Sequence, residues 1–226
     1  TKCYYVDDEL RIEKLNQLGG SNEIMSEDSH ADICSKIIRK YNSDCKITNI
    51  IVKGATTGDL YKLIAGLDFA SEIDDINIVN LSIGFTEVQY AVELNRVIGK
   101  LFKKKIKIVA SYSNSDVETY PASLNNVIGC KASKKSKELG FYKQNRIYYA
   151  TGTHLIRSNF GKLFFTPNVN SFATSYITSL ISNNIFIEWM YCSYKQGVSS
   201  QEYWKKGDNT MKIAKNIKRN INIVEA

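Results

Sequence analysis

The chain has 226 residues, 43% of them hydrophobic and 23% charged, which are ordinary values for a globular protein with a sizeable core. Its net charge of +7 suits an anionic partner, and an acidic peptide is compatible with that charge. No nucleic-acid motif is present and no aromatic residues interleave with the basic runs, so we expect no binding to nucleic acid.

Short apolar runs alternate with amphipathic patterns along the chain. The runs predict buried strands over residues 3–6, 47–52, 76–81, 106–111, 127–130 and 147–150. Apolar residues at three- and four-residue spacing predict helices over residues 33–41, 60–67 and 91–102, and another after Ser171. This alternation predicts an α/β fold with a mainly parallel central sheet and helices on both faces. No linker or repeat divides the chain, so we expect a single domain over residues 1–226.

Polar side chains follow several of these predicted strands. Asp7 follows the first strand directly, His30 opens the next helix, and Asn114 lies just beyond the strand that ends at Ser111. Ser171 begins a helix, where a serine commonly acts only as a cap. Sites in parallel sheets form at the carboxyl ends of strands. An acid, a base, an amide donor and a hydroxyl at that edge are the groups that a serine hydrolase requires.

Seven segments, in chain order, resemble the motifs of the subtilisin-like serine peptidases, or subtilases. They are residues 6–10, 30–35, 78–84, 109–115, 120–122 followed by 127–130, 150–152 and 170–175. The resemblance spans most of the chain and implies a three-layer subtilisin-like fold. Several positions depart from the family pattern without removing a reacting group: Ala31, Ile33, Ser113, Val169, Asn170 and Ser175.

The resemblance assigns roles to four residues. Ser171 would be the nucleophile, His30 the general base, and Asp7 the carboxylate that orients His30. The oxyanion would lie between the Asn114 side chain and the Ser171 N–H, since subtilisin is itself the standard example of an asparagine oxyanion donor. Asp8 is adjacent, but alternate strand residues face opposite ways, and the register of the motif favours Asp7.

The substrate site is also implied by the resemblance. Ser82, Ile83 and Gly84 would pair with an extended peptide and form one wall of the primary specificity pocket. Tyr112 and Ser113, with Asn114, would form the other wall. Thr119 falls near the base, which indicates a pocket of limited depth.

We expect no cofactor and no metal. The five cysteines are scattered, odd in number and without a CxxC pair, which argues against a disulfide framework and a zinc knuckle. The short segment 41–45 stands where many subtilases carry a longer calcium-binding loop, so we expect no calcium at that position. The stretch 185–190 is too short and interrupted to span a bilayer.

The cysteine usage and the lack of a signal peptide favour a cytoplasmic location. The sequence opens on Thr1 rather than methionine, so secretion after loss of an upstream segment stays open. An inhibitory pro-segment, removed or supplied separately, is compatible with the family. Abundant lysine, asparagine and isoleucine with only two prolines favour an AT-rich bacterial source.

Two functions follow. The first is a serine endopeptidase that processes a restricted peptide or precursor protein, such as one with a leader peptide. The second is a catalytically impaired subtilase that binds a peptide or protein without cutting it, which the altered motif flanks favour.

Overall fold

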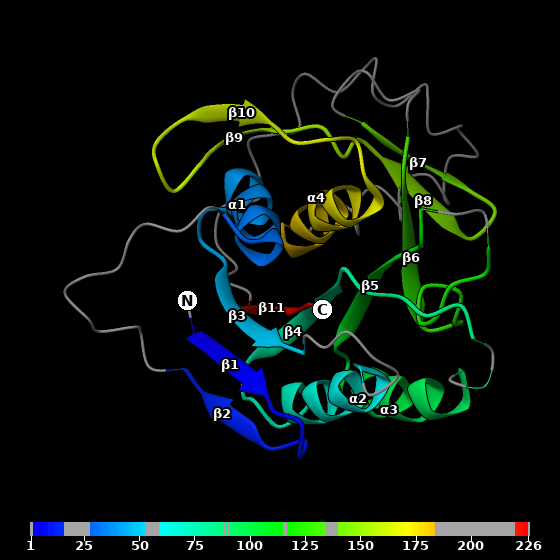
Figure 1. Ribbon diagram of the computed structural model, residues 1–226. Helices are drawn as coiled ribbons and strands as arrows, with labels where there is room; N and C mark the ends of the chain where they lie inside the picture. The colour runs from blue at the N-terminus through cyan, green and yellow to red at the C-terminus, as the bar shows by residue number, and fades with distance from the viewer. Residues whose placement is uncertain are drawn as a thin grey trace.

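The computed structural model describes residues 2–15, 28–52, 59–87, 89, 91–114, 117–133, 140–183 and 220–225 (Figure 1). The apolar stretch 185–190, the basic run 205–219 and Cys192 lie outside these residues. No helix within the described ranges has the length and apolar character needed to cross a bilayer.

A central sheet organises the described part of the chain, in the order β2-β1-β3-β11-β4-β5-β6-β8-β7. Its strands are β1 (Lys2–Val6), β2 (Ile12–Lys14), β3 (Lys46–Ile51), β4 (Ile76–Leu81), β5 (Lys107–Ser111), β6 (Val127–Ala132), β7 (Phe141–Gln144), β8 (Ile147–Ala150) and β11 (Asn220–Glu225). All inner neighbours are parallel, and only β2 and β7 pair antiparallel, at the two edges. The prediction of a mainly parallel α/β fold is confirmed.

Helices cover both faces of the sheet (Figure 1). On one face lie α1 (His30–Tyr41) and α4 (Asn170–Ser182); on the other lie α2 (Asp59–Ala70) and α3 (Ala91–Lys103). The start of α1 is fixed by a capping box, in which the Ser29 hydroxyl accepts from the Asp32 N–H at 3.1 Å and the Asp32 carboxylate accepts from the Ser29 N–H. This cap sets where the helix that carries His30 begins.

The core lies in two parts because successive strand residues point to opposite faces of the sheet. On β4, Ile78 packs towards α1 and α4, whereas Val79 packs towards α2 and α3. On β5, Val109 and Ile108 divide in the same way. Continuous apolar strands are therefore needed here, which is why the sequence pattern identifies them.

The sequence pattern did not predict five strands. Two of them, β9 (Leu155–Arg157) and β10 (Leu163–Phe165), form a separate antiparallel hairpin outside α1. A strand of three residues is too short to show the alternation of apolar and polar residues. β11 comes last in the chain yet lies between β3 and β4, a position set by long-range pairing rather than by local sequence.

Candidate functional site

His30 lies at the first turn of α1 and faces the start of α4. Its ring stacks on that of Phe172, with 5.1 Å between ring centroids and 24° between ring planes. Phe172 directly follows Ser171, so the stack brings the predicted base to the helix turn that carries the predicted nucleophile. Partial burial lowers the pKa of His30 below its ordinary value, which favours the neutral imidazole that a general base requires.

Ser171 lies in the first turn of α4. Its carbonyl accepts from the Ser175 hydroxyl at 3.1 Å, and its own hydroxyl has no hydrogen bond with any described residue. The N-cap residue Val169 supplies no side-chain cap. The first N–H groups of the helix are therefore left for other acceptors, which suits an oxyanion at this turn.

Asn170 holds the start of α4 against two strand ends. Its Nδ2 donates to the carbonyl oxygens of Tyr112 at 3.1 Å and Ser113 at 2.8 Å, and its Oδ1 accepts from the Ala132 N–H at 2.7 Å. One side chain thus joins the loop after β5, the end of β6 and the residue before Ser171. In the sequence this asparagine is only a departure from the family motif, and no local signal there points to this role.

The segment before α4 is fastened from the other side by Asn168 and Gly152. The Asn168 side chain accepts from the Gly152 N–H at 2.7 Å and donates to the Ser133 carbonyl at 3.3 Å. A Cβ at Gly152 would lie 2.5 Å from the Val169 carbonyl oxygen, so only glycine allows this approach. The backbone that leads into Ser171 is therefore fixed by Asn170 on one side and by Asn168 and Gly152 on the other.

Asp7 lies at the carboxyl end of β1, as predicted, but its carboxylate is engaged by its own loop. Oδ1 accepts from the N–H groups of Glu9 at 2.9 Å and Arg11 at 2.8 Å, and Oδ2 pairs with Arg11 Nε at 2.8 Å. The Arg11 guanidinium is the main cause that lowers the pKa of Asp7. No hydrogen bond or ion pair links Asp7 to His30 among the described residues, so the structure does not bring these two side chains into contact.

Asn114 lies just beyond β5 and is exposed. Its neighbour Ser113 is bound through its carbonyl by Asn170, so the loop that carries Asn114 is held against the start of α4. The Asn114 side chain has no hydrogen bond with another described residue. An exposed amide at this position can donate to a bound group.

The two predicted pocket walls meet across Thr119, which is fully buried. Thr119 Oγ1 accepts from the Ser113 N–H and lies 3.1 Å from the Ser113 hydroxyl. On the other side, a Cβ built on Gly84 would lie only 2.3 Å from Thr119 Cγ2. Beyond these walls, Phe85 and Tyr120 exchange two backbone hydrogen bonds of 2.8 and 2.7 Å. The space between the walls is therefore filled at its base.

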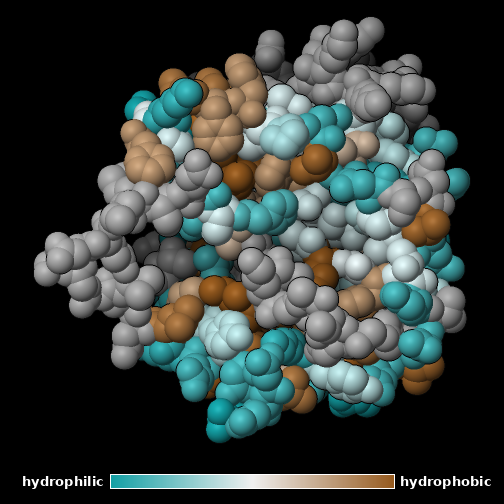
Figure 2. All heavy atoms as spheres, viewed as in Figure 1, coloured by the Kyte–Doolittle hydropathy of each residue, from teal (hydrophilic) through white to brown (hydrophobic). Residues whose placement is uncertain are grey.

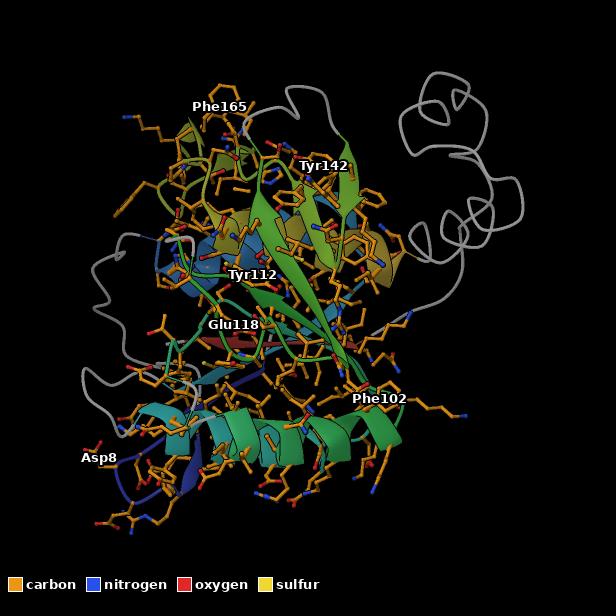
Figure 3. The ribbon with its side chains drawn as sticks, turned by 90° about the vertical axis from the view of Figure 1, so that its right-hand side faces the viewer. Asp8, Phe102, Tyr112, Glu118, Tyr142 and Phe165 are labelled. Atoms are coloured by element: carbon orange, nitrogen blue, oxygen red, sulfur yellow. The ribbon has the colours of Figure 1, made fainter. Side chains whose placement is uncertain are left out.

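The remaining wall residues lie at the end of β4. Ile83 is buried, and Ser82 Oγ lies 3.5 Å from the Sγ atom of Cys34 on α1. Tyr112 lies between the two helical layers (Figure 3). The described residues contain no group of three or more His, Cys, Asp or Glu side chains that could hold a metal ion.

His154, the other histidine of the chain, is buried. Only 2% of it is exposed. Its Nδ1 lies 3.0 Å from the Tyr41 hydroxyl and its Nε2 lies 3.1 Å from the Thr151 carbonyl, so the tautomer with hydrogen on Nε2 satisfies both. Burial lowers the pKa of His154 to about 4. Its contacts join α1 to the loop before β9 and explain it as a structural residue.

No protein-family model matches the chain, and no curated protein matches it. Among solved structures, the prenylagaramide maturation protease PagA is similar with 16% sequence identity and a TM-score of 0.49. The match covers 67% of this chain and 57% of that protein, so the chain spans less than two thirds of it. A likeness of this degree does not bear on activity.

Proposed function

We propose that the chain is a subtilisin-like serine endopeptidase that processes a restricted peptide or precursor protein. The observation that carries this proposal is the stack of His30 on Phe172, since it joins the predicted base to the turn of α4 that holds Ser171. A neutral histidine close to a serine hydroxyl is the pairing that nucleophilic catalysis requires, and the Ser171 hydroxyl makes no hydrogen bond with another described residue.

The roles follow from these positions. His30 takes the proton of Ser171 as the hydroxyl attacks the peptide carbonyl, and returns it to the leaving amine. The developing oxyanion is held by the N–H groups at the uncapped start of α4 and by the exposed Asn114 amide. Asn170 acts as a positioning residue, because it fixes the Ser113 carbonyl relative to the nucleophile turn.

The filled base of the pocket supports a small residue on the acyl side of the cleaved bond. Thr119 occupies the space between Gly84 and Ser113, so glycine, alanine or serine fits the pocket better than a large side chain. Small side chains give little binding energy of their own. A protease with such a pocket acts selectively only when other parts of the substrate are also recognised.

The test is covalent labelling of the folded chain with a fluorophosphonate, read by intact mass. One adduct is expected on the wild type and none on Ser171→Ala. The matched control is Ser43→Ala, which removes an exposed serine from the turn after α1 and is expected to label fully. His30→Ala is expected to slow labelling without unfolding the protein, since His30 is at the exposed start of α1.

A second function, peptide binding without cleavage, is favoured by one observation. The Asp7 carboxylate is held by Arg11 and two N–H groups, and forms no hydrogen bond or ion pair with His30. Without an orienting carboxylate, a serine–histidine pair loses much of its activity. If the folded wild-type protein forms no adduct, this second function is supported.

A further inference from the structure

The β9–β10 hairpin carries an exposed apolar face. Leu155 lies opposite Phe165, and Arg157 lies opposite Leu163, so these four side chains share one face of the hairpin. Leu155, Leu163 and Phe165 are exposed, as is Phe160 in the turn. In Figure 2 brown and tan surface gathers at the upper left, where this hairpin lies. We call Leu155, Phe160, Leu163 and Phe165 the hairpin patch.

The exposure of the hairpin patch follows from the register of the two strands. The alternate residues Ile156 and Phe164 point inward and pack in the core formed with α1 and α4. The outward residues therefore cannot turn inward without unpacking Ile156. Phe165 is 69% exposed, and Figure 3 shows it at the end of the molecule beyond these helices. Neighbouring exposed apolar side chains of this size mark an interaction surface.

Three cations border the hairpin patch. Lys40 donates to the Leu155 carbonyl at 2.8 Å, and Arg157 donates to the Gly161 carbonyl at 2.7 Å. Lys162 is exposed beside Leu163. None of the three forms an ion pair with an acidic side chain in the described part of the chain. The patch therefore has an apolar centre and a positive rim.

The hairpin turn is tied to the helix that carries His30. The Asn159 N–H donates to the Asp28 carboxylate at 3.1 Å, and Lys36 donates to Asn159 Oδ1 at 2.8 Å. Asp28 precedes His30 by two residues. The hairpin that carries the patch is thus fixed to the same helix that presents the candidate base.

We propose that the hairpin patch binds an acidic, apolar segment of a peptide, extended along β10. In the described part of the chain β10 pairs only with β9, so its other edge can accept a strand, and alternate apolar side chains would extend the patch. The positive rim selects acidic residues that flank this apolar segment. A role in substrate recognition rests on the proposed protease function, whereas the binding itself does not.

Two other occupants fit less well. A second copy of this chain would place like charges opposite one another, because each patch carries Lys40, Arg157 and Lys162 on its rim. A bilayer would leave the open edge of β10 without hydrogen-bond partners in the hydrocarbon region. An acidic peptide satisfies both the edge and the charges.

The test is fluorescence anisotropy of a short synthetic peptide in which glutamates flank a segment where leucine or phenylalanine alternates with serine. The full chain carrying Ser171→Ala is used, so that the peptide is not cut. The acidic peptide is expected to bind, and a peptide with lysine in place of glutamate is not. Phe165→Ser is expected to weaken binding by about tenfold, the loss of one well-buried aromatic contact. Lys162→Glu is expected to weaken it as well.

The matched control is Phe102→Ser on α3, which removes another exposed phenylalanine, 57% exposed, from the opposite face of the sheet. Its affinity for the acidic peptide is expected to equal that of the parent. No binding of the acidic peptide at low salt, or equal binding by Phe165→Ser, overturns the proposal. The proposal is also overturned if the peptide does not bind and the protein instead sediments with vesicles of phosphatidylcholine and phosphatidylglycerol in a way that depends on Phe165. That result would assign the patch to a lipid surface. If the peptide binds but the fluorophosphonate does not label Ser171, the proposed binding surface is supported and the proposed protease function is not.

Discussion

The side-chain amide of Asn170 donates to the carbonyl of Ser113 at 2.8 Å and so joins the loop after β5 to the first turn of α4. Both elements carry residues of the candidate site, Asn114 on the loop and Ser171 on the helix. Their separation is therefore fixed by a side chain that belongs to neither the base nor the nucleophile. A charge-neutral clamp of this kind can be removed without touching a reacting group.

Asn170→Ala is expected to lower the free energy of unfolding by about 2–4 kcal/mol, because it removes the acceptor of the Ala132 N–H and a donor to two carbonyls. Urea unfolding measures this loss. Asn170→Asp keeps the acceptor for Ala132 but places a carboxylate against the carbonyls of Tyr112 and Ser113, so its loss should be at least as large. An unchanged unfolding midpoint in both variants would show that the clamp contributes nothing.

Thr119 is expected to set the size of the pocket. Thr119→Ser keeps the hydroxyl that bonds to Ser113 and removes only the methyl group that faces Gly84. It should raise kcat/KM for peptides with a larger acyl-side residue, such as leucine, relative to alanine. A panel of fluorogenic peptides that differ only at this residue measures the ratio. The same ratio in wild type and variant would place the pocket elsewhere.

The contact between Thr119 and Gly84 also gives a test that needs no substrate. A Cβ at Gly84 would lie 2.3 Å from Thr119 Cγ2, so Gly84→Ala is expected to lower stability by roughly 1–3 kcal/mol through overpacking. Because Thr119→Ser removes the clashing methyl group, the double variant should recover most of the loss. Thermal unfolding of the four proteins completes this cycle. Additive effects would mean that the two residues do not press on each other.

Local sequence predicts the continuous elements of the fold and misses the parts made by pairing at a distance. β4 and β5 are apolar on both faces because α1 and α4 cover one and α2 and α3 the other, and this leaves a clear pattern. The placement of β11 and the fold of the β9–β10 hairpin leave no such pattern in the local sequence. In the site, motif order indicates His30 and Ser171, while Asn170 acts only through partners that lie 38 and 57 residues away.

His154 is expected to make stability fall in mild acid. Burial lowers its pKa to about 4, whereas in the unfolded chain it titrates near 6.5. Its contribution is therefore complete above pH 6.5 and is lost as pH falls from about 6.5 towards 4, by roughly 3 kcal/mol at most. Urea unfolding between pH 7.5 and pH 4.5 measures the slope.

The control for this pH dependence is His154→Gln. This variant should be less stable than the wild type at pH 7.5, but its free energy of unfolding should fall less on acidification. His30 has a pKa lowered in the same direction and is present in both proteins, so its effect cancels in the difference. Parallel pH profiles for wild type and His154→Gln would exclude the buried, neutral state of His154.

The pH dependence of Ser171 labelling is expected to show whether Asp7 pairs with His30. His30 must be neutral to take a proton, and burial without an acidic partner lowers its pKa below 6.5. Labelling by a fluorophosphonate should therefore be near its maximum at pH 7 and fall only in more acidic buffer. If Asp7 left Arg11 and paired with His30, it would stabilise the imidazolium and move the midpoint above 6.5. Asp7→Asn distinguishes the two: an unchanged midpoint indicates that Asp7 stays with Arg11, and a midpoint that drops indicates that Asp7 turns to His30 when the site is occupied.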